Sequence, residues 1–125
     1  MVNRWVANLV APQTLALAGT RSTPTKTPAQ RLYETSDHLV TLWEEANTGG
    51  KGSYVIGQVY SRQENVSLQP ELVLFTATAG GEALLADHEQ NEFHVPSLMP
   101  GNYVIRCWLE GHNVLALHDV VIGNV

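Results

Sequence analysis

The sequence predicts an all-β fold, an antiparallel β-sandwich of about seven to nine short strands. Turn signals made of glycine, proline and asparagine recur about every eight to twelve residues, which is typical of such sandwiches. Short runs rich in apolar residues lie between these turns, for example residues 54–60. No segment keeps a helical period of apolar residues for more than about ten positions. Residues 7–17 come nearest, and Pro12 opposes a helix there.

The chain is expected to divide into two parts. Residues 1–30 would hold one short strand, at 5–10, followed by a threonine- and proline-rich linker at 19–29. The two prolines of the linker remove backbone donors, and no apolar period continues through it. Residues 31–125 would form the sandwich domain itself.

The sandwich strands are predicted in order from short apolar or alternating runs. We expect them over residues 32–34, 38–45, 54–60, 72–78, 82–86, 93–95, 103–109 and 114–122. Segments rich in glycine, proline and asparagine, or polar throughout, predict the turns at 47–52, 80–81, 87–91, 96–101 and 111–113. Gly80 and Gly81 favour a tight hairpin, because glycine adopts positive φ at no steric cost. The strand at 72–78 is apolar on both faces, which predicts a central position in its sheet.

Composition limits the classes of function. A 125-residue chain that is 44% hydrophobic can bury a core without disulfides. Its one cysteine, Cys107, excludes an internal disulfide and a cysteine-based zinc site, and fits a reducing, cytoplasmic location. A net charge of −5 argues against general nucleic-acid binding, which needs a dense basic surface. No apolar run approaches the roughly 18 residues of a membrane span.

Charge is distributed unevenly along the chain. Up to Arg62 there are six basic and four acidic residues, whereas beyond it Arg106 stands alone against eight acidic residues. Such asymmetry can steer a basic partner toward one half of the protein. It is equally compatible with two solvated faces of one domain, and the sequence leaves both interpretations open.

The residues that could support catalysis or metal binding do not form a recognisable site. The five histidines have neither helical i, i+4 spacing nor an H-x-H strand pair, and they are His38, His88, His94, His112 and His118. Neighbouring Asp and His residues in a strand face opposite sides, so they cannot form a dyad. No G-x-S-x-G elbow is present, and Cys107 lies on an apolar strand face as an inert thiol. We therefore expect no enzyme activity, no metal and no cofactor.

Three segments carry a family resemblance. They are YVIGQVY (54–60), the segment 71–95 and LMPGNYVIRCWLEG (98–111), in which LMPGNY is similar to an LPPGxY strand start. Together they resemble a carboxypeptidase-regulatory-like (prealbumin-like) β-sandwich domain. RWVANLV (4–10) and RLYETSDHLVTLWEE (31–45) are similar to the segment that precedes this sandwich in bacterial anti-sigma-factor-like proteins.

The resemblance implies a non-enzymatic interaction or regulatory module of a bacterial signalling assembly. Its partner would be a protein, such as a sigma factor, a processing protease or another signalling component. Trp108 alternates with Arg106 and Glu110 on the more polar face of its strand, which makes these three the candidate interaction residues. Trp108 could instead be covered by the N-terminal segment. The alternative function is an extracellular carbohydrate-binding or stalk module that uses the aromatic side chains.

Overall fold

The computed structural model describes residues 4–14, 29–48, 52–81 and 83–123, with the backbone alone for residues 11–14, 29 and 112. The described chain is all-β, as predicted, and a 3₁₀ turn, η2 (Glu110–His112), joins its last two strands. Its strands are β1 (Arg4–Thr14), β2 (Ala29–Glu34), β3 (His38–Ala46), β4 (Ser53–Ser61), β5 (Val66–Leu68), β6 (Leu72–Ala77), β7 (Leu84–Leu85), β8 (Asp87–Glu89), β9 (Glu92–Leu98), β10 (Gly101–Leu109) and β11 (Asn113–Ile122).

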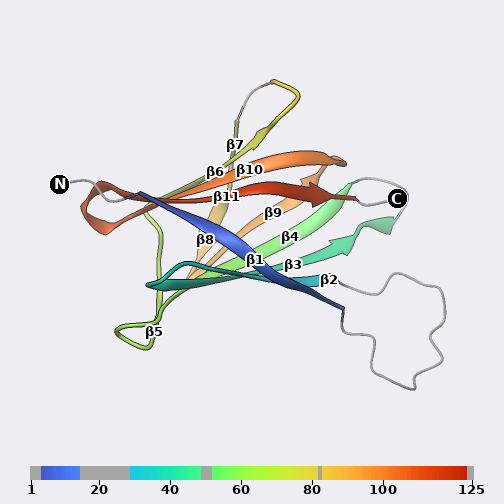
Figure 1. Cartoon of the computed structure of the whole chain (residues 1–125). Helices are drawn as coiled ribbons and strands as arrows, with labels where there is room; N and C mark the ends of the chain where they lie inside the picture. Colours follow the sequence, from blue (N-terminus) through green and yellow to red (C-terminus); the bar gives the residue numbers. More distant parts are fainter. Residues whose placement is uncertain (1–3, 15–28, 49–51, 82, 124–125) are drawn as a thin grey trace, which may run out of the picture.

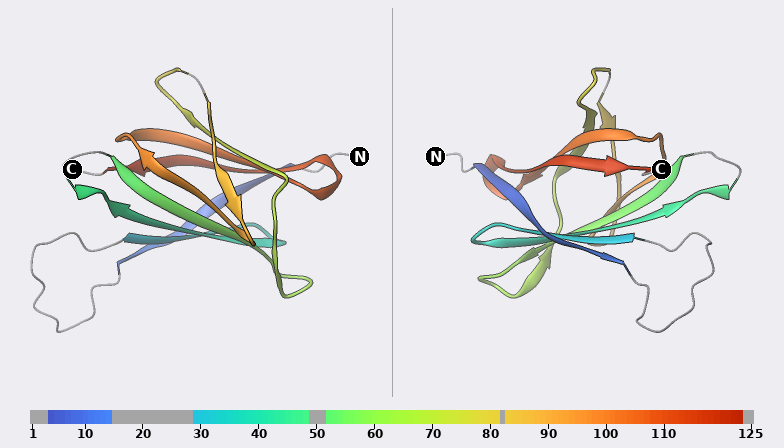
Figure 2. Two further views of the ribbon diagram at one scale, coloured as in Figure 1. Left: turned by 180° about the vertical axis from the view of Figure 1, so that it is seen from behind. Right: turned by 45° about the vertical axis from the view of Figure 1, so that its right-hand side comes forward.

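The strands form one continuous sheet that curls into a nearly closed barrel (Figure 1). Their order is β7-β6-β10-β11-β1-β2-β3-β4-β9-β8, and β5 pairs with β4 beside this path. Every pairing is antiparallel except that of β1 with β11, which is parallel. The two halves of the sheet face each other across the core, as both views in Figure 2 show.

Two segments connect the halves of the sheet. β1 pairs with β11 through Arg4–Ala7 and then leaves it to pair with β2, with a register shift between Leu9 and Ala11. Such an irregularity lets one strand turn from one half of a sheet to the other. On the opposite side the chain runs from β7 directly into β8, which lie at the two ends of the strand order. Ala86 joins these two strands, and its N–H donates to the carbonyl of Val73 at 3.0 Å.

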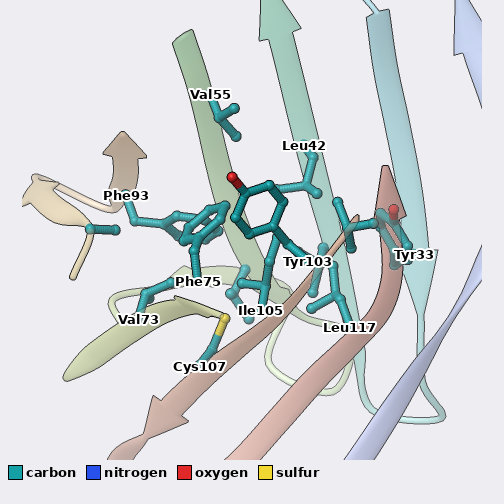
Figure 3. Close-up of a cluster of buried hydrophobic side chains, with 14 of the residues drawn as sticks. Tyr33, Leu42, Val55, Val73, Phe75, Phe93, Tyr103, Ile105, Cys107 and Leu117 are labelled. Atoms are coloured by element: carbon teal, nitrogen blue, oxygen red, sulfur yellow. The ribbon is translucent and has the colours of Figure 1, made fainter. Parts of the chain in front are cut away.

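Side chains at every second position of the strands fill the inside of the barrel. In β4 and β10 every second residue is buried, so Val55 and Val59 face Ile105 and Cys107 across the core. Aromatic rings occupy the centre, with Phe75 in edge contact with Phe93 and Tyr103 (Figure 3). Aromatic contacts of this kind stabilise a core beyond the area that they bury.

A glycine makes room for one of these rings, that of Phe93. Gly57 in β4 lies directly opposite Phe93 in β9, and a Cβ at Gly57 would stand 2.1 Å from Cζ of that ring. Because glycine has no side chain, the Phe93 ring can pack against the β4 backbone at this position.

An ion-pair network, which we call the latch, ties the end of β11 to β2, β3 and β4. Arg31 Nη2 donates to Glu44 Oε1 at 2.8 Å and to the carbonyl of Val121 at 2.7 Å. Glu44 Oε2 accepts from Ser53 Oγ at 3.0 Å and from the N–H of Gly123 at 2.7 Å. The latch therefore bridges the place where β1 has left β11.

The structure corrects several sequence-based expectations. The two-layer sandwich is not confirmed, because β1 pairs with strands of both halves and makes them one sheet. Eleven strands replace the expected seven to nine: the expected turn at 87–91 contains β8, which is held by backbone bonds to β9, and β5 was not expected. The N-terminal strand is longer than 5–10, and it pairs with β11 and β2. Most of the linker, residues 19–28, lies outside the described residues.

Candidate functional site

Side chains on the outer face of β1, β10 and β11 form a groove of about 390 Å³. We call it the outer groove. Arg106 and Trp108 are two residues apart in β10 and therefore point to the same side of the sheet. The remaining lining residues come from the start of β1 and from β11, and they are Arg4, Trp5, Val6, Val114 and Ala116.

Strand register brings these side chains together. Arg106 lies opposite Ala116 on β11, and Trp108 lies opposite Val114. On the other side of β10, Arg106 lies opposite Leu74 and Trp108 opposite Leu72. Each of the two large side chains thus stands between smaller apolar neighbours.

The outer groove is lined by apolar side chains and two arginines. Val6 is 57% exposed, and no acidic residue is among the lining side chains. Within the described part of the chain, neither Arg4 nor Arg106 makes a hydrogen bond or an ion pair through its side chain. The groove can therefore offer two guanidinium groups to a ligand that carries carboxylates beside an apolar surface.

The three predicted interaction residues do not share one site. Trp108 and Arg106 line the outer groove, and both are half-buried. Glu110 follows the end of β10 and belongs to η2, where the alternation of the strand has ended. It lines a different hollow, at one end of the barrel. β1 is not paired with β10, because β11 lies between them.

That second hollow, which we call the mouth pocket, has a volume of about 630 Å³. It opens at the end of the barrel where β10 turns into β11 and where β5 lies (left in Figure 1). Its walls come from the start of β1, the β2–β3 turn, the β4–β5 hairpin, the segment before β6 and the end of β10. The lining residues are Trp5, Asp37, His38, Ser61, Gln63, Glu64, Ser67, Leu68, Gln69, Glu71, Leu109, Glu110 and Asn113.

The mouth pocket is acidic. Four lining residues carry carboxylates, Asp37, Glu64, Glu71 and Glu110, and none of the lining residues is a lysine or an arginine. Only Asp37 has a side-chain partner among the described residues, since its Oδ1 accepts from Gln63 Nε2 at 3.0 Å.

His38 and Trp5 form the inner wall of this pocket. The two rings meet edge to face with centroids 4.6 Å apart, and His38 is only 7% exposed. Burial lowers the pKa of His38, and the neighbouring carboxylate of Asp37 opposes part of this shift. The ring is therefore held toward its neutral form.

Thr35 fixes which nitrogen of His38 carries the proton. Thr35 Oγ1 accepts from the backbone N–H groups of Asp37 and His38, at 3.1 and 2.9 Å. Because both lone pairs of this oxygen are then used, its hydroxyl proton is left to donate to His38 Nδ1, 3.4 Å away. This arrangement makes Nδ1 an acceptor and assigns the ring proton of the neutral imidazole to Nε2, for which the described residues supply no acceptor.

A third, smaller groove of about 240 Å³ runs along the outside of β3, β4 and β9. Trp43 forms part of it, and polar side chains surround the ring. Gln58 Nε2 donates to Glu92 Oε2 at 3.2 Å on the same surface. Gln30, Thr41, Ile56 and Gly57 complete the lining.

The other residues that the sequence singled out lie apart. In the described part of the chain no three His, Cys, Asp or Glu side chains are grouped so that they could hold a metal ion. His94 lies beside Tyr54 on β9, and the side chain of His112 lies outside the described set. Cys107 is buried as predicted, and burial raises the pKa of its thiol to about 12. Among the residues described, no helix is long and apolar enough to cross a membrane.

Comparison with known proteins gives no relative for this chain: no protein-family model, no curated protein and no solved structure matches it. The resemblance to carboxypeptidase-regulatory-like domains thus stays a prediction from sequence.

Sequence reasoning missed the mouth pocket. Its key side chains lie at positions as far apart as Trp5, His38 and Glu110, and no local spacing connects them. The only signal in the sequence was the excess of acidic residues after Arg62, which supply three of the four carboxylates.

Proposed function

We propose that the chain is a non-enzymatic protein-interaction module of a bacterial signalling assembly and that the outer groove is its binding surface. The observation that carries the proposal is Arg106 beside Trp108 on one open face, with the apolar side chain of Val6 exposed nearby. Tryptophan and arginine are the residues that most often dominate the binding energy of protein interfaces. Because Arg4 and Arg106 have no acidic partners in the described chain, the expected partner segment carries carboxylates next to apolar side chains.

The identity of the partner rests on the sequence resemblance alone. It favours a sigma factor, a processing protease or another signalling protein, and a cytoplasmic location. We also propose that the fold is related to the prealbumin-like sandwich. The two facing halves of the curled sheet are compatible with this relation.

Differential capture tests the proposed surface. The wild-type chain, Arg106→Gln, Trp108→Leu and a charge-matched control would be immobilised and exposed to the same bacterial lysate. The control is Asn91→Asp, which changes the net charge as Arg106→Gln does at an exposed turn between β8 and β9. Urea unfolding of each variant checks that it is folded.

The expected result is a protein that wild type and Asn91→Asp retain at moderate salt and that the two groove variants lose at least tenfold, a change of about 1.4 kcal/mol. Equal retention of every captured protein by all four chains would contradict the proposal.

Carbohydrate binding in an extracellular setting is the second candidate, and the Trp43 groove favours it. An aromatic ring bordered by amide, hydroxyl and carboxylate groups can stack on a sugar ring and hydrogen-bond its hydroxyls. A glycan panel read by tryptophan fluorescence tests this function, with Trp43→Phe as the variant that must abolish any response and Trp108→Phe as its control.

A further inference from the structure

We propose that the mouth pocket binds a lysine or arginine side chain of a basic peptide segment, at a site that shares Trp5 with the outer groove and is opposite to it in charge. Its volume of about 630 Å³ is that of an ordinary ligand pocket, and barrel mouths are common places for such pockets.

The charge of the lining residues favours a cationic ligand. Four carboxylates line the pocket without a lysine or arginine among the lining residues. The carboxylates of Glu64, Glu71 and Glu110 make no hydrogen bond or ion pair within the described chain, so they remain available to a ligand. They come from three separate segments around the rim, and a long cationic side chain can pass between them.

The inner wall adds a second and independent feature. Trp5 is half-buried behind the carboxylates, with its ring against His38. A cation over the face of a tryptophan ring is attracted by about 0.5–2 kcal/mol, more so where water is displaced. The pocket thus combines an aromatic surface with negative charge, which is the chemistry that recognises ammonium and guanidinium groups.

His38 distinguishes a peptide from a simple cation. The residue is only 7% exposed and lines the pocket, and its Nε2–H has no acceptor in the described structure. This N–H is not among the buried side-chain atoms of the described chain that lack a partner, so it can hydrogen-bond to water and give that bond to a ligand that supplies an acceptor. The backbone carbonyl next to a lysine or arginine is such an acceptor, whereas a polyamine has none.

A bare metal ion is not the expected occupant of this pocket. The described chain has no group of three close side chains that would coordinate one.

Binding would be measured with an acetylated, amidated nonapeptide of Gly and Lys residues. A peptide with norleucine in place of each lysine, and spermidine, serve as comparison ligands. The protein would carry Trp43→Phe and Trp108→Phe, so that fluorescence reports on Trp5 alone, the one other tryptophan of the chain. Urea unfolding would confirm that this background is folded.

Three results are expected. The lysine peptide quenches or shifts Trp5 fluorescence, and the norleucine peptide does not. Glu71→Gln and Glu110→Gln each weaken the affinity about two- to fivefold, because each removes one partly exposed ion pair. Glu45→Gln, an exposed charge outside the pocket, leaves the affinity unchanged. His38→Phe, which keeps a ring beside Trp5 but removes the donor, reduces the preference for the peptide over spermidine.

The opposite outcomes overturn the proposal. If Glu45→Gln weakened the affinity for the lysine peptide as much as Glu71→Gln and Glu110→Gln do, the peptide would be attracted to the net charge of the protein rather than to the pocket. Equal affinity of the norleucine peptide would mean apolar binding, and equal affinity of spermidine would remove the role of His38. Trp108→Phe is present in every protein of this test, the reference included, and the lysate experiment uses the native chain with its own Arg106 and Trp108 variants, so failure here leaves that experiment unaffected.

Discussion

Replacing Glu44 by glutamine should destabilise the protein strongly, because Glu44 is the centre of the latch. Its carboxylate accepts three hydrogen bonds, from Arg31, Ser53 and the backbone of Gly123. The amide of the Glu44→Gln variant retains one oxygen and turns the other acceptor into a donor. In one orientation the amide NH₂ group faces the Arg31 guanidinium, and in the other it faces the donors of Ser53 and Gly123. Two donors therefore meet in either orientation.

The magnitude follows from burial and partner count. The side chains of Arg31 and Glu44 are 14% and 10% exposed, so solvent screens their ion pair only weakly. Removing one partner of a buried pair is unfavourable by about 3–5 kcal/mol, and a hydrogen bond to a charged group contributes about 1.5–3 kcal/mol. One acceptor survives in the glutamine variant, and we therefore expect a loss of about 2–4 kcal/mol of unfolding free energy. That corresponds to a fall of about 8–16 °C in Tm for a domain of this size.

Urea unfolding followed by circular dichroism measures the loss, with Glu45→Gln as the matched control. Glu45 is the next residue in β3, is exposed and lies outside the latch, so its substitution should change stability by less than about 0.5 kcal/mol. A double-mutant cycle with Arg31→Gln should give a coupling energy of at least about 1 kcal/mol. A Glu44→Gln variant as stable as Glu45→Gln would refute the view that the latch holds the end of β11.

Three further changes test the core and the buried titratable groups. Gly57→Ala should lower the unfolding free energy by about 1–3 kcal/mol, since its Cβ would meet the Phe93 ring, and adding Phe93→Leu should recover part of that loss. Stability should fall as the pH drops below about 6.5, because burial lowers the pKa of His38 and the unfolded chain therefore binds more protons in that range. Urea midpoints at several pH values measure this fall, which should be smaller in His38→Phe. Cys107, with a thiol pKa of about 12, should react with a thiol reagent only at the rate of unfolding, so reaction of the native protein within minutes would contradict its burial.

Alternation and turn chemistry predicted the strands that have one buried face. β4 and β10 follow the expected segments 54–60 and 103–109 closely, because every second side chain enters the core. β8 escaped prediction for the opposite reason. Its sequence, Asp-His-Glu, has no apolar alternation, and only backbone pairing with β9 makes it a strand.

Long-range pairing limited what could be predicted of the barrel and the site. The parallel pairing of β1 with β11 joins residues more than a hundred positions apart, and no local pattern specifies it. The sequence placed Arg106 and Trp108 on one strand face by their spacing, and the same argument failed for Glu110, because β10 ends at Leu109. Alternation identifies side chains on a face within a strand, whereas a pocket at the barrel end depends on how several turns come together.

The latch and the proposed peptide site lie at different ends of this barrel, so mutations can test them separately. The latch lies where β11 ends and β3 approaches β4, whereas the mouth pocket lies where β10 turns into β11. Glu44 is buried and fully partnered, so its charge stabilises the fold. Glu71 and Glu110 are exposed without side-chain partners in the described chain and repel their acidic neighbours, so neutralising them should leave stability unchanged or raise it. A carboxylate whose removal weakens peptide binding without weakening the fold is acting as a ligand-binding group, and a carboxylate whose removal lowers both is part of the scaffold.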